Sequence, residues 1–153
     1  MPKLLVFVPC EKVIISQDEN NPTLVAILQQ VGGHYESPDN PPSGVMENFM
    51  IPMRWNVFSL WRREPSDFEQ TFVQVFRIKG ANGDTVVEAA TEFRMEKATQ
   101  RITAQLPGIA VNGGSGTWQL ELFVHEKGAQ LPEEPVGCYP LDVNFVEKLK
   151  APR

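Results

Sequence analysis

Residues 116–126 constrain the fold of this chain more than any other segment, because their character changes at every second position. Polar side chains separate most of the apolar ones, which are Trp118, Leu120, Leu122 and Val124. In an extended chain successive side chains point to opposite faces, so this spacing puts the apolar set on one face. The segment is therefore predicted to be a β-strand with one buried face and one largely solvated face.

Short apolar segments with the same two-residue period recur along the chain, separated by Gly, Pro, Asn and Asp. Eight or so strands are expected from these segments, which span residues 4–8, 13–16, 23–31, 51–63, 68–79, 85–96, 101–106, 116–126 and 136–146. A helix is the alternative for residues 23–31, but Pro22 and the β-branched residues favour an extended chain there. Turn residues at this spacing, without a helical period, are typical of an all-β fold.

Asn82-Gly83 is the clearest turn signal in the sequence. This dipeptide favours a type I′ turn, in which both central residues have positive φ. Residues 68–79 and 85–96 are therefore predicted to pair as antiparallel neighbours.

The whole pattern predicts an all-β protein whose strands form a two-sheet antiparallel β-sandwich, immunoglobulin-like or C2-like. A β-barrel is the alternative way to close such strands around a core. The 153 residues are expected to form a single domain, 1–153, because domains commonly contain about 100–150 residues. Residues 147–153 are predicted to be a polar tail.

The net charge of the chain and the lengths of its apolar runs limit which partners and cellular locations are expected. The net charge is -5, which disfavours nucleic acid because an acidic surface repels a polyanion. Arg62 and Arg63 are the only adjacent basic residues, and they are interpreted as a solvated strand end. No apolar run approaches the roughly 18 residues of a membrane-spanning helix. The run before Cys10 is too short for a secretory signal, so a soluble cytoplasmic protein is expected.

Cysteine and histidine offer little chemistry in this sequence. Cys10 and Cys138 are the only cysteines, and both are predicted to be free thiols, as is usual in the cytosol. A disulfide between them is the alternative, which requires their Cα atoms to lie within about 7 Å. Their spacing is also wrong for a zinc site. The two histidines, His34 and His125, belong to no catalytic or metal-binding motif. The chain is therefore predicted to be no enzyme and to hold no metal or other cofactor.

Residues 32–48 are predicted to be an irregular loop, because they combine Gly32-Gly33 with several prolines. A loop longer than about 12–15 residues in a compact domain is usually functional or poorly ordered. The side chains that this loop offers to a partner are His34, Tyr35, Glu36 and Asp39. These four residues form the predicted contact surface.

The aromatic residues have two interpretations. Trp55, Trp61 and Trp118 each carry a large apolar area, and such side chains usually belong to a core. Alternatively, they are exposed stacking platforms for a sugar, which would make the protein a carbohydrate- or small-ligand-binding sandwich. Phe58 and Phe123 lie on the nominally outer faces of their strands, where a second core layer is favoured over a subunit contact.

Two parts of the sequence carry a family resemblance. Residues 10–15 read cysteine, an acidic residue, one further residue and an apolar run, and residues 23–28 read Thr-Leu followed by small and apolar residues. Residues 116–122 read Gly-x-aromatic-x-Leu-x-Leu. These patterns resemble a family of small bacterial β-sandwich proteins of unknown function. The chain departs from them at Ala26, where glycine is usual, and in its longer segment 32–48. The resemblance implies a β-sandwich in a bacterial cytoplasm, and it implies no activity.

These features together predict a non-catalytic protein-interaction or structural module. Sandwich folds hold loops rigidly at their ends, and edge strands can pair with a partner or with another copy. A protein partner or self-association is therefore the expected interaction, and a small ligand is the alternative. Neither nucleic acid nor a membrane is expected as a partner.

Overall fold

The computed structural model describes residues 1–16, 21–36 and 49–148, and strands dominate this part of the chain. The strands are β1 (Lys3–Ile15), β2 (Pro22–Ile27), β3 (Gln30–Tyr35), β4 (Met50–Arg62), β5 (Thr71–Lys79), β6 (Thr85–Arg94), β7 (Thr99–Ala110), β8 (Gly116–Glu126) and β9 (Gly137–Glu147). Among the described residues, two short 3-10 helices, η2 (Pro65–Asp67) and η3 (Val111–Gly113), lie between strands. None of the helices described is long and apolar enough to cross a membrane.

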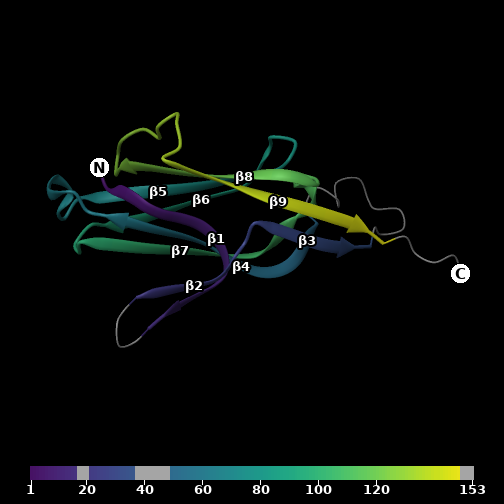
Figure 1. Ribbon diagram of the computed structural model, residues 1–153. Helices are drawn as coiled ribbons and strands as arrows, with labels where there is room; N and C mark the ends of the chain where they lie inside the picture. The colour runs from purple at the N-terminus through teal and green to yellow at the C-terminus, as the bar shows by residue number, and fades with distance from the viewer. Residues whose placement is uncertain (17–20, 37–48, 149–153) are drawn as a thin grey trace, which may run out of the picture.

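The strands form two stacked sheets, which confirms the predicted β-sandwich (Figure 1). One sheet has the strand order β2-β1-β4-β7, and the other has the order β3-β9-β8-β5-β6. Every neighbouring pair is antiparallel except β3 and β9, which run parallel. The two sheets remain separate layers, so the architecture is a sandwich rather than the single closed sheet that was the alternative.

Strand β8 supplies the centre of the core, as its alternation predicts. The side chains of Trp118, Leu120, Leu122 and Val124 are all at most 2% exposed. They face the inner side chains of the opposite sheet, which include Trp55, Val57 and Trp61 of β4. Burial of these large apolar surfaces is the main force that holds the two sheets together.

The three tryptophans belong to the core, which confirms the first interpretation. Trp55, Trp61 and Trp118 are 1%, 0% and 1% exposed, and each indole N–H donates a hydrogen bond. The acceptors are the carbonyl of Gly108 at 2.9 Å, Oε1 of Gln74 at 2.7 Å and the carbonyl of Gly114 at 2.8 Å, respectively. A sugar-stacking platform needs exposed rings, so the carbohydrate site built on these tryptophans is wrong.

Phe58 and Phe123 form a second apolar layer on the outer faces of the two sheets. Their rings are only 1% and 2% exposed, although they point away from the main core. Val8 of β1 lies directly opposite Phe58, and Val75 of β5 lies opposite Phe123. The predicted second layer is therefore confirmed, because neither ring is exposed enough to serve as a subunit contact.

The first strand is longer than its sequence indicates. Residues 4–8 and 13–16 were expected to be separate runs, but β1 is continuous from Lys3 to Ile15. Pro9 interrupts the sequence pattern without ending the strand. It lies where β1 changes partners, and its carbonyl accepts a hydrogen bond of 2.9 Å from the N–H of Leu28.

The predicted single strand over residues 23–31 is wrong, because the chain crosses between the sheets there. The N–H of Leu28 donates a hydrogen bond to the carbonyl of Pro9 in β1. The carbonyl of the next residue, Gln29, instead accepts one from the N–H of Asp142 in β9 at 3.0 Å. Ala26, which lies just before this crossing, has a positive φ of 49°. Residues 23–31 are therefore divided between β2 and β3, and the helix alternative is excluded as well.

The irregular loop predicted over residues 32–48 is wrong at its start. Residues 32–35 belong to β3, which pairs with β9 in parallel. Gly33 supports this packing, because a Cβ atom there would overlap the side chain of Ile51 in β4. The glycine that suggested a loop instead allows two strands to approach closely.

The hairpin between β5 and β6 confirms the predicted pairing but not the predicted turn. Phe76 lies opposite Ala89 in the antiparallel register. Of the two central residues, only Gly83 has a positive φ, at 87°, so the turn is not type I′. The N–H of Gly83 donates to the carbonyl of Gly80 at 3.0 Å and closes the loop.

Strand β7 runs past Pro107-Gly108, which was expected to end it. Proline is tolerated because β7 is an edge strand, where one side of the backbone needs no partner. A Cβ atom at Gly108 would overlap Met50 and the backbone of Ile51, so glycine allows the bulged part of β4 to pack closely. The outer face of β7 is therefore long enough to form a floor beside β4.

Candidate functional site

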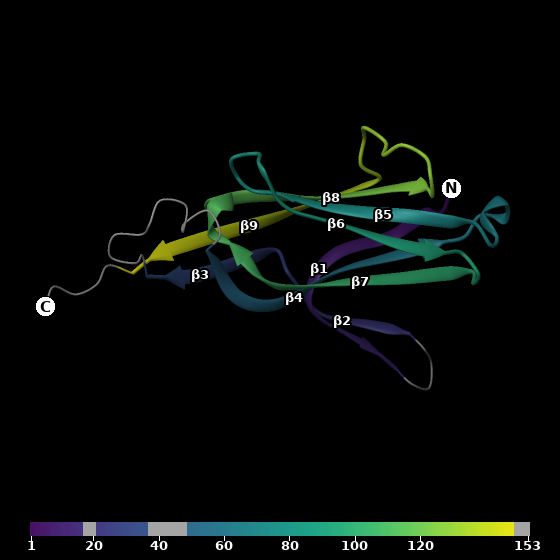
Figure 2. The ribbon, with the colours of Figure 1, turned by 180° about the vertical axis from the view of Figure 1, so that it is seen from behind.

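The most distinctive surface feature is a two-stranded arm that leaves the sandwich. We call residues 10–15 of β1 together with β2 the arm; its paired residues run from Cys10 with Ile27 to Ile15 with Pro22. Cys10 with Asn56 is the last pair between β1 and β4, so β1 leaves β4 at that point. Figures 1 and 2 show the arm projecting beneath the sandwich from opposite sides.

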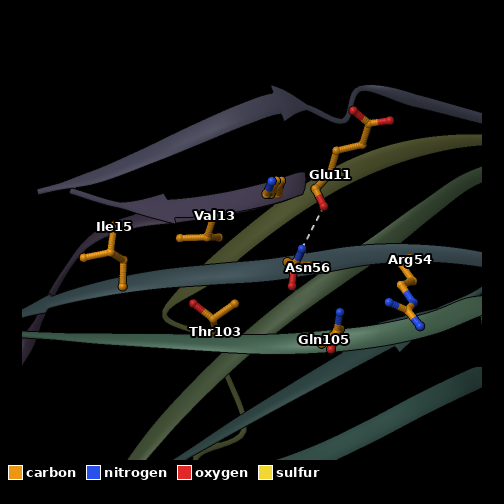
Figure 3. A pocket seen from close by; sticks show the side chains of 8 residues that line it. Glu11, Val13, Ile15, Arg54, Asn56, Thr103 and Gln105 are labelled. Carbon is orange, nitrogen blue, oxygen red and sulfur yellow. Dashed lines mark hydrogen bonds between the residues drawn. The ribbon is translucent and has the colours of Figure 1, made fainter. Parts of the chain in front are cut away.

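A groove lies between the arm and the outer face of β4 and β7, and we call it the arm groove. Its largest hollow has a volume of about 510 Å³ (Figure 3). This hollow is lined by Glu11, Lys12, Val13, Ile15, Arg54, Asn56, Thr103 and Gln105. A volume of this size falls within the roughly 300–1,000 Å³ of typical ligand sites.

Two further hollows continue the groove along β7. Their volumes are about 290 and 270 Å³. The first and second hollows share Ile15 and Thr103, and the second and third share Lys97, Thr99 and Arg101. The arm groove is therefore an elongated channel, which matches an extended ligand better than a compact one.

Strand geometry determines which side chains form the floor. Alternate residues of β4 and β7 point outward, and their register places Asn56 opposite Gln105 and Leu60 opposite Arg101. Between these pairs, Thr103 is exposed while Phe58, its partner, is buried. The floor therefore presents amides, a hydroxyl and cations over an apolar layer.

One hydrogen bond fixes the root of the arm over this floor. Nδ2 of Asn56 donates to the backbone carbonyl of Glu11 at 2.8 Å, as the dashed line in Figure 3 shows. Glu11, Val13 and Ile15 of the arm all line the hollow, but the side chain of Glu11 points away from the floor. The inner side of the arm is thus mainly aliphatic.

The contact surface predicted from the sequence lies elsewhere. His34 and Tyr35 are on β3, in the other sheet, and Glu36 follows the end of this strand. Tyr35 packs on Phe49, with ring centroids 6.0 Å apart. Asp39 lies outside the described residues. None of the three described residues lines the arm groove.

The residues that line the groove were not selected from the sequence. Arg54 and Asn56 alternate with Trp55 and Val57 in the sequence, and the polar residues 101, 103 and 105 alternate with apolar ones in the same way. This alternation is the only available signal. It cannot reveal that β4 and β7 are neighbours or that the arm covers them, because both facts depend on strand order.

The histidines and cysteines are dispersed. His125 lies on β8, two strands away from β3, and its Nδ1 is 2.9 Å from the carbonyl of Glu126. Both cysteines are free thiols, as predicted; Cys10 is buried and Cys138 is exposed. Within residues 1–16, 21–36 and 49–148, no group of three or more His, Cys, Asp or Glu side chains is arranged to hold a metal ion.

Comparison with solved structures finds chains that resemble this one. The chain is similar to an immunoglobulin-like protein from Pseudomonas aeruginosa, with 9% sequence identity and a TM-score of 0.39. The match covers 94% of this chain and 96% of that one. No family model matches the sequence, and no curated protein matches it.

Proposed function

We propose that this protein is a non-catalytic interaction module and that its partner, a protein, docks in the arm groove. The groove itself is the observation that carries this proposal: an elongated channel between a projecting hairpin and an exposed polar floor. Its mixture of hydrogen-bonding, cationic and aliphatic side chains suits the binding of a peptide chain, which offers groups of all three complementary kinds.

The exposed apolar side chains of the arm support this proposal. Ile15, which lines the groove, is 50% exposed. Ile14 and Ile27 belong to the arm but line none of the three hollows, and they are 43% and 50% exposed. A two-stranded hairpin alone is only marginally stable in water, so such an arm gains stability when a partner covers it. Burial of these side chains would contribute about 25 cal/mol per Å² of apolar surface.

Site-specific photo-cross-linking in native cells tests the proposal. A photoreactive residue at Thr103 or Gln105 is expected to trap a defined protein, since both side chains are exposed on the groove floor. The matched control is Gln119, an exposed residue on the outer face of β8. An adduct between two copies of this chain would identify self-association. The absence of adducts from the floor, or the same adducts from Gln119, would refute the proposal.

A further inference from the structure

The arm groove concentrates positive charge on an acidic protein. Among the described residues, the charged side chains that line its three hollows are Lys12, Arg54, Arg94, Lys97 and Arg101 on the basic side, and Glu11 and Glu96 on the acidic side. The chain as a whole has a net charge of -5. The described lining of the groove therefore has more basic than acidic side chains, whereas the whole chain has more acidic than basic ones.

Three of these cations have no acidic partner in the described part of the chain. Lys12, Arg54 and Lys97 are exposed, and none forms an ion pair with a described residue. Arg94 differs, because its guanidinium lies 3.8 Å from Glu96. The available positive charge thus comes from both the arm and the floor.

The outer face of the other sheet provides an internal contrast. There, Nε of Arg77 lies 2.7 Å from Glu88, and Nζ of Lys79 lies 2.9 Å from Glu121. Cations on that face are neutralised by their cross-strand neighbours, as is usual for a solvated strand surface. Lys12, Arg54 and Lys97, which have no acidic partner among the described residues, therefore differ from the paired cations of the other sheet.

The arrangement of charge and apolar surface favours one class of occupant. In an extended peptide, side chains alternate between two faces. One face of such a peptide would meet Arg54 and the polar floor, and the other would meet Val13 and Ile15 of the arm. The floor from Arg54 to Leu60 spans about 20 Å, at about 3.3 Å per residue, which suits a peptide of about six residues.

We propose that the arm groove selects an extended protein segment in which acidic side chains alternate with apolar ones. This inference rests on the proposed function and adds the chemistry of the partner. A nucleic acid fits the same observations less well. Its continuous phosphate charge would face the acidic remainder of the surface, and it offers no apolar side chains to the arm.

Fluorescence polarisation with two labelled peptides of about eight residues tests this inference. One peptide alternates Glu and Val, and the other carries Gln in place of Glu. The Glu peptide is expected to bind more tightly, and added salt should weaken it. The double variant Arg54→Glu/Lys97→Glu should bind it about tenfold more weakly, because two exposed attractions become repulsions.

Lys148→Glu is the matched control, since Lys148 is exposed, follows β9 and lies outside the groove. It should leave the affinity unchanged, and circular dichroism should show that all variants keep the strand content. Equal binding of both peptides, no binding of either, or an unchanged affinity of the double variant would overturn the inference. Displacement of the Glu peptide by a lower concentration of oligothymidylate would also overturn it and identify nucleic acid.

The two proposals fail in different experiments. A cross-linked partner segment that lacks carboxylates would refute the charge selectivity while the docking site stands. If floor positions trap no partner in cells, the proposed function fails, whatever the peptides do.

Discussion

The amide of Asn56 holds the carbonyl of Glu11 at 2.8 Å, and this bond joins the sandwich to the arm. Cys10 and Asn56 form the last pair between β1 and β4, so Glu11 is the first residue beyond the shared ladder. The Asn56 side chain thus extends the contact by one residue after the backbone pairing ends. This hydrogen bond lies where the arm separates from the floor, at the start of the groove.

Asn56→Ala should loosen the arm without unfolding the sandwich. The variant loses one hydrogen bond, which is worth about 0.5–1.5 kcal/mol in net stability. Hydrogen exchange should become faster at the amides of the arm, while the amides of β8 should keep their protection. Asn144→Ala is the control, because Asn144 is exposed on β9. Equal arm protection in both variants would show that the bond does not hold the arm.

Ala26→Gly should stabilise the protein. Ala26 has a φ of 49°, a left-handed conformation that costs a non-glycine residue about 1–2 kcal/mol. Glycine removes this strain but adds entropy to the unfolded chain, so a net gain of about 0.5–1 kcal/mol is expected. Urea unfolding measures it. Ala90→Gly, at an exposed strand position without positive φ, should be destabilising instead. A loss of stability in both variants would contradict the prediction.

Asp67 should make stability depend on pH in the acid range. Burial alone would raise its pKa, but hydrogen bonds from the Met1 ammonium and the Glu64 N–H, with the ammonium charge, outweigh burial and lower the pKa. The carboxylate lies 2.8 Å from the Met1 nitrogen and is almost fully buried. The stabilisation of the fold by the ionised Asp67 carboxylate is therefore complete above the unfolded pKa of about 3.9. It is lost as the pH falls through the lowered pKa of the folded protein.

Asp67→Asn should accordingly cost about 1–3 kcal/mol at neutral pH, because a buried charged acceptor is removed. The difference from the parent protein should shrink as the pH falls below about 3.9, which urea titrations at several pH values would show. Asp142→Asn is the control. Because Asp142 is exposed, this substitution should reduce the free energy of unfolding by no more than about 0.5 kcal/mol. A difference that persists at the lowest pH would argue against the ionised carboxylate as its cause.

The two thiols should react at very different rates. Cys138 is exposed, whereas Cys10 is 0% exposed and burial raises the pKa of its thiol. Because the thiolate is the reactive form, Ellman's reagent should modify Cys138 in the native protein and Cys10 only after unfolding in urea. Cys138→Ser should remove the fast phase completely. A fast phase that survives in this variant would mean that Cys10 is accessible.

Local sequence patterns predicted much of the fold. The alternation in residues 116–126 predicted a strand with one buried face, and Asn82-Gly83 predicted the β5–β6 pair, because both signals depend only on neighbouring residues. Predictions failed where distant chain segments meet. Gly33 and Pro107 look like strand breakers in sequence, yet close packing against Ile51 and an edge position, respectively, make them compatible with strands.

The sequence by itself determined the class of fold and favoured burial of the tryptophans, since side-chain period and apolar area are local properties. Only the tertiary structure decided which charged side chains share one surface. Lys12, Arg54 and Lys97 lie far apart along the chain, and strand order together with the departure of the arm from β4 brings them to one groove. Strand order depends on long-range pairing, which no single segment encodes.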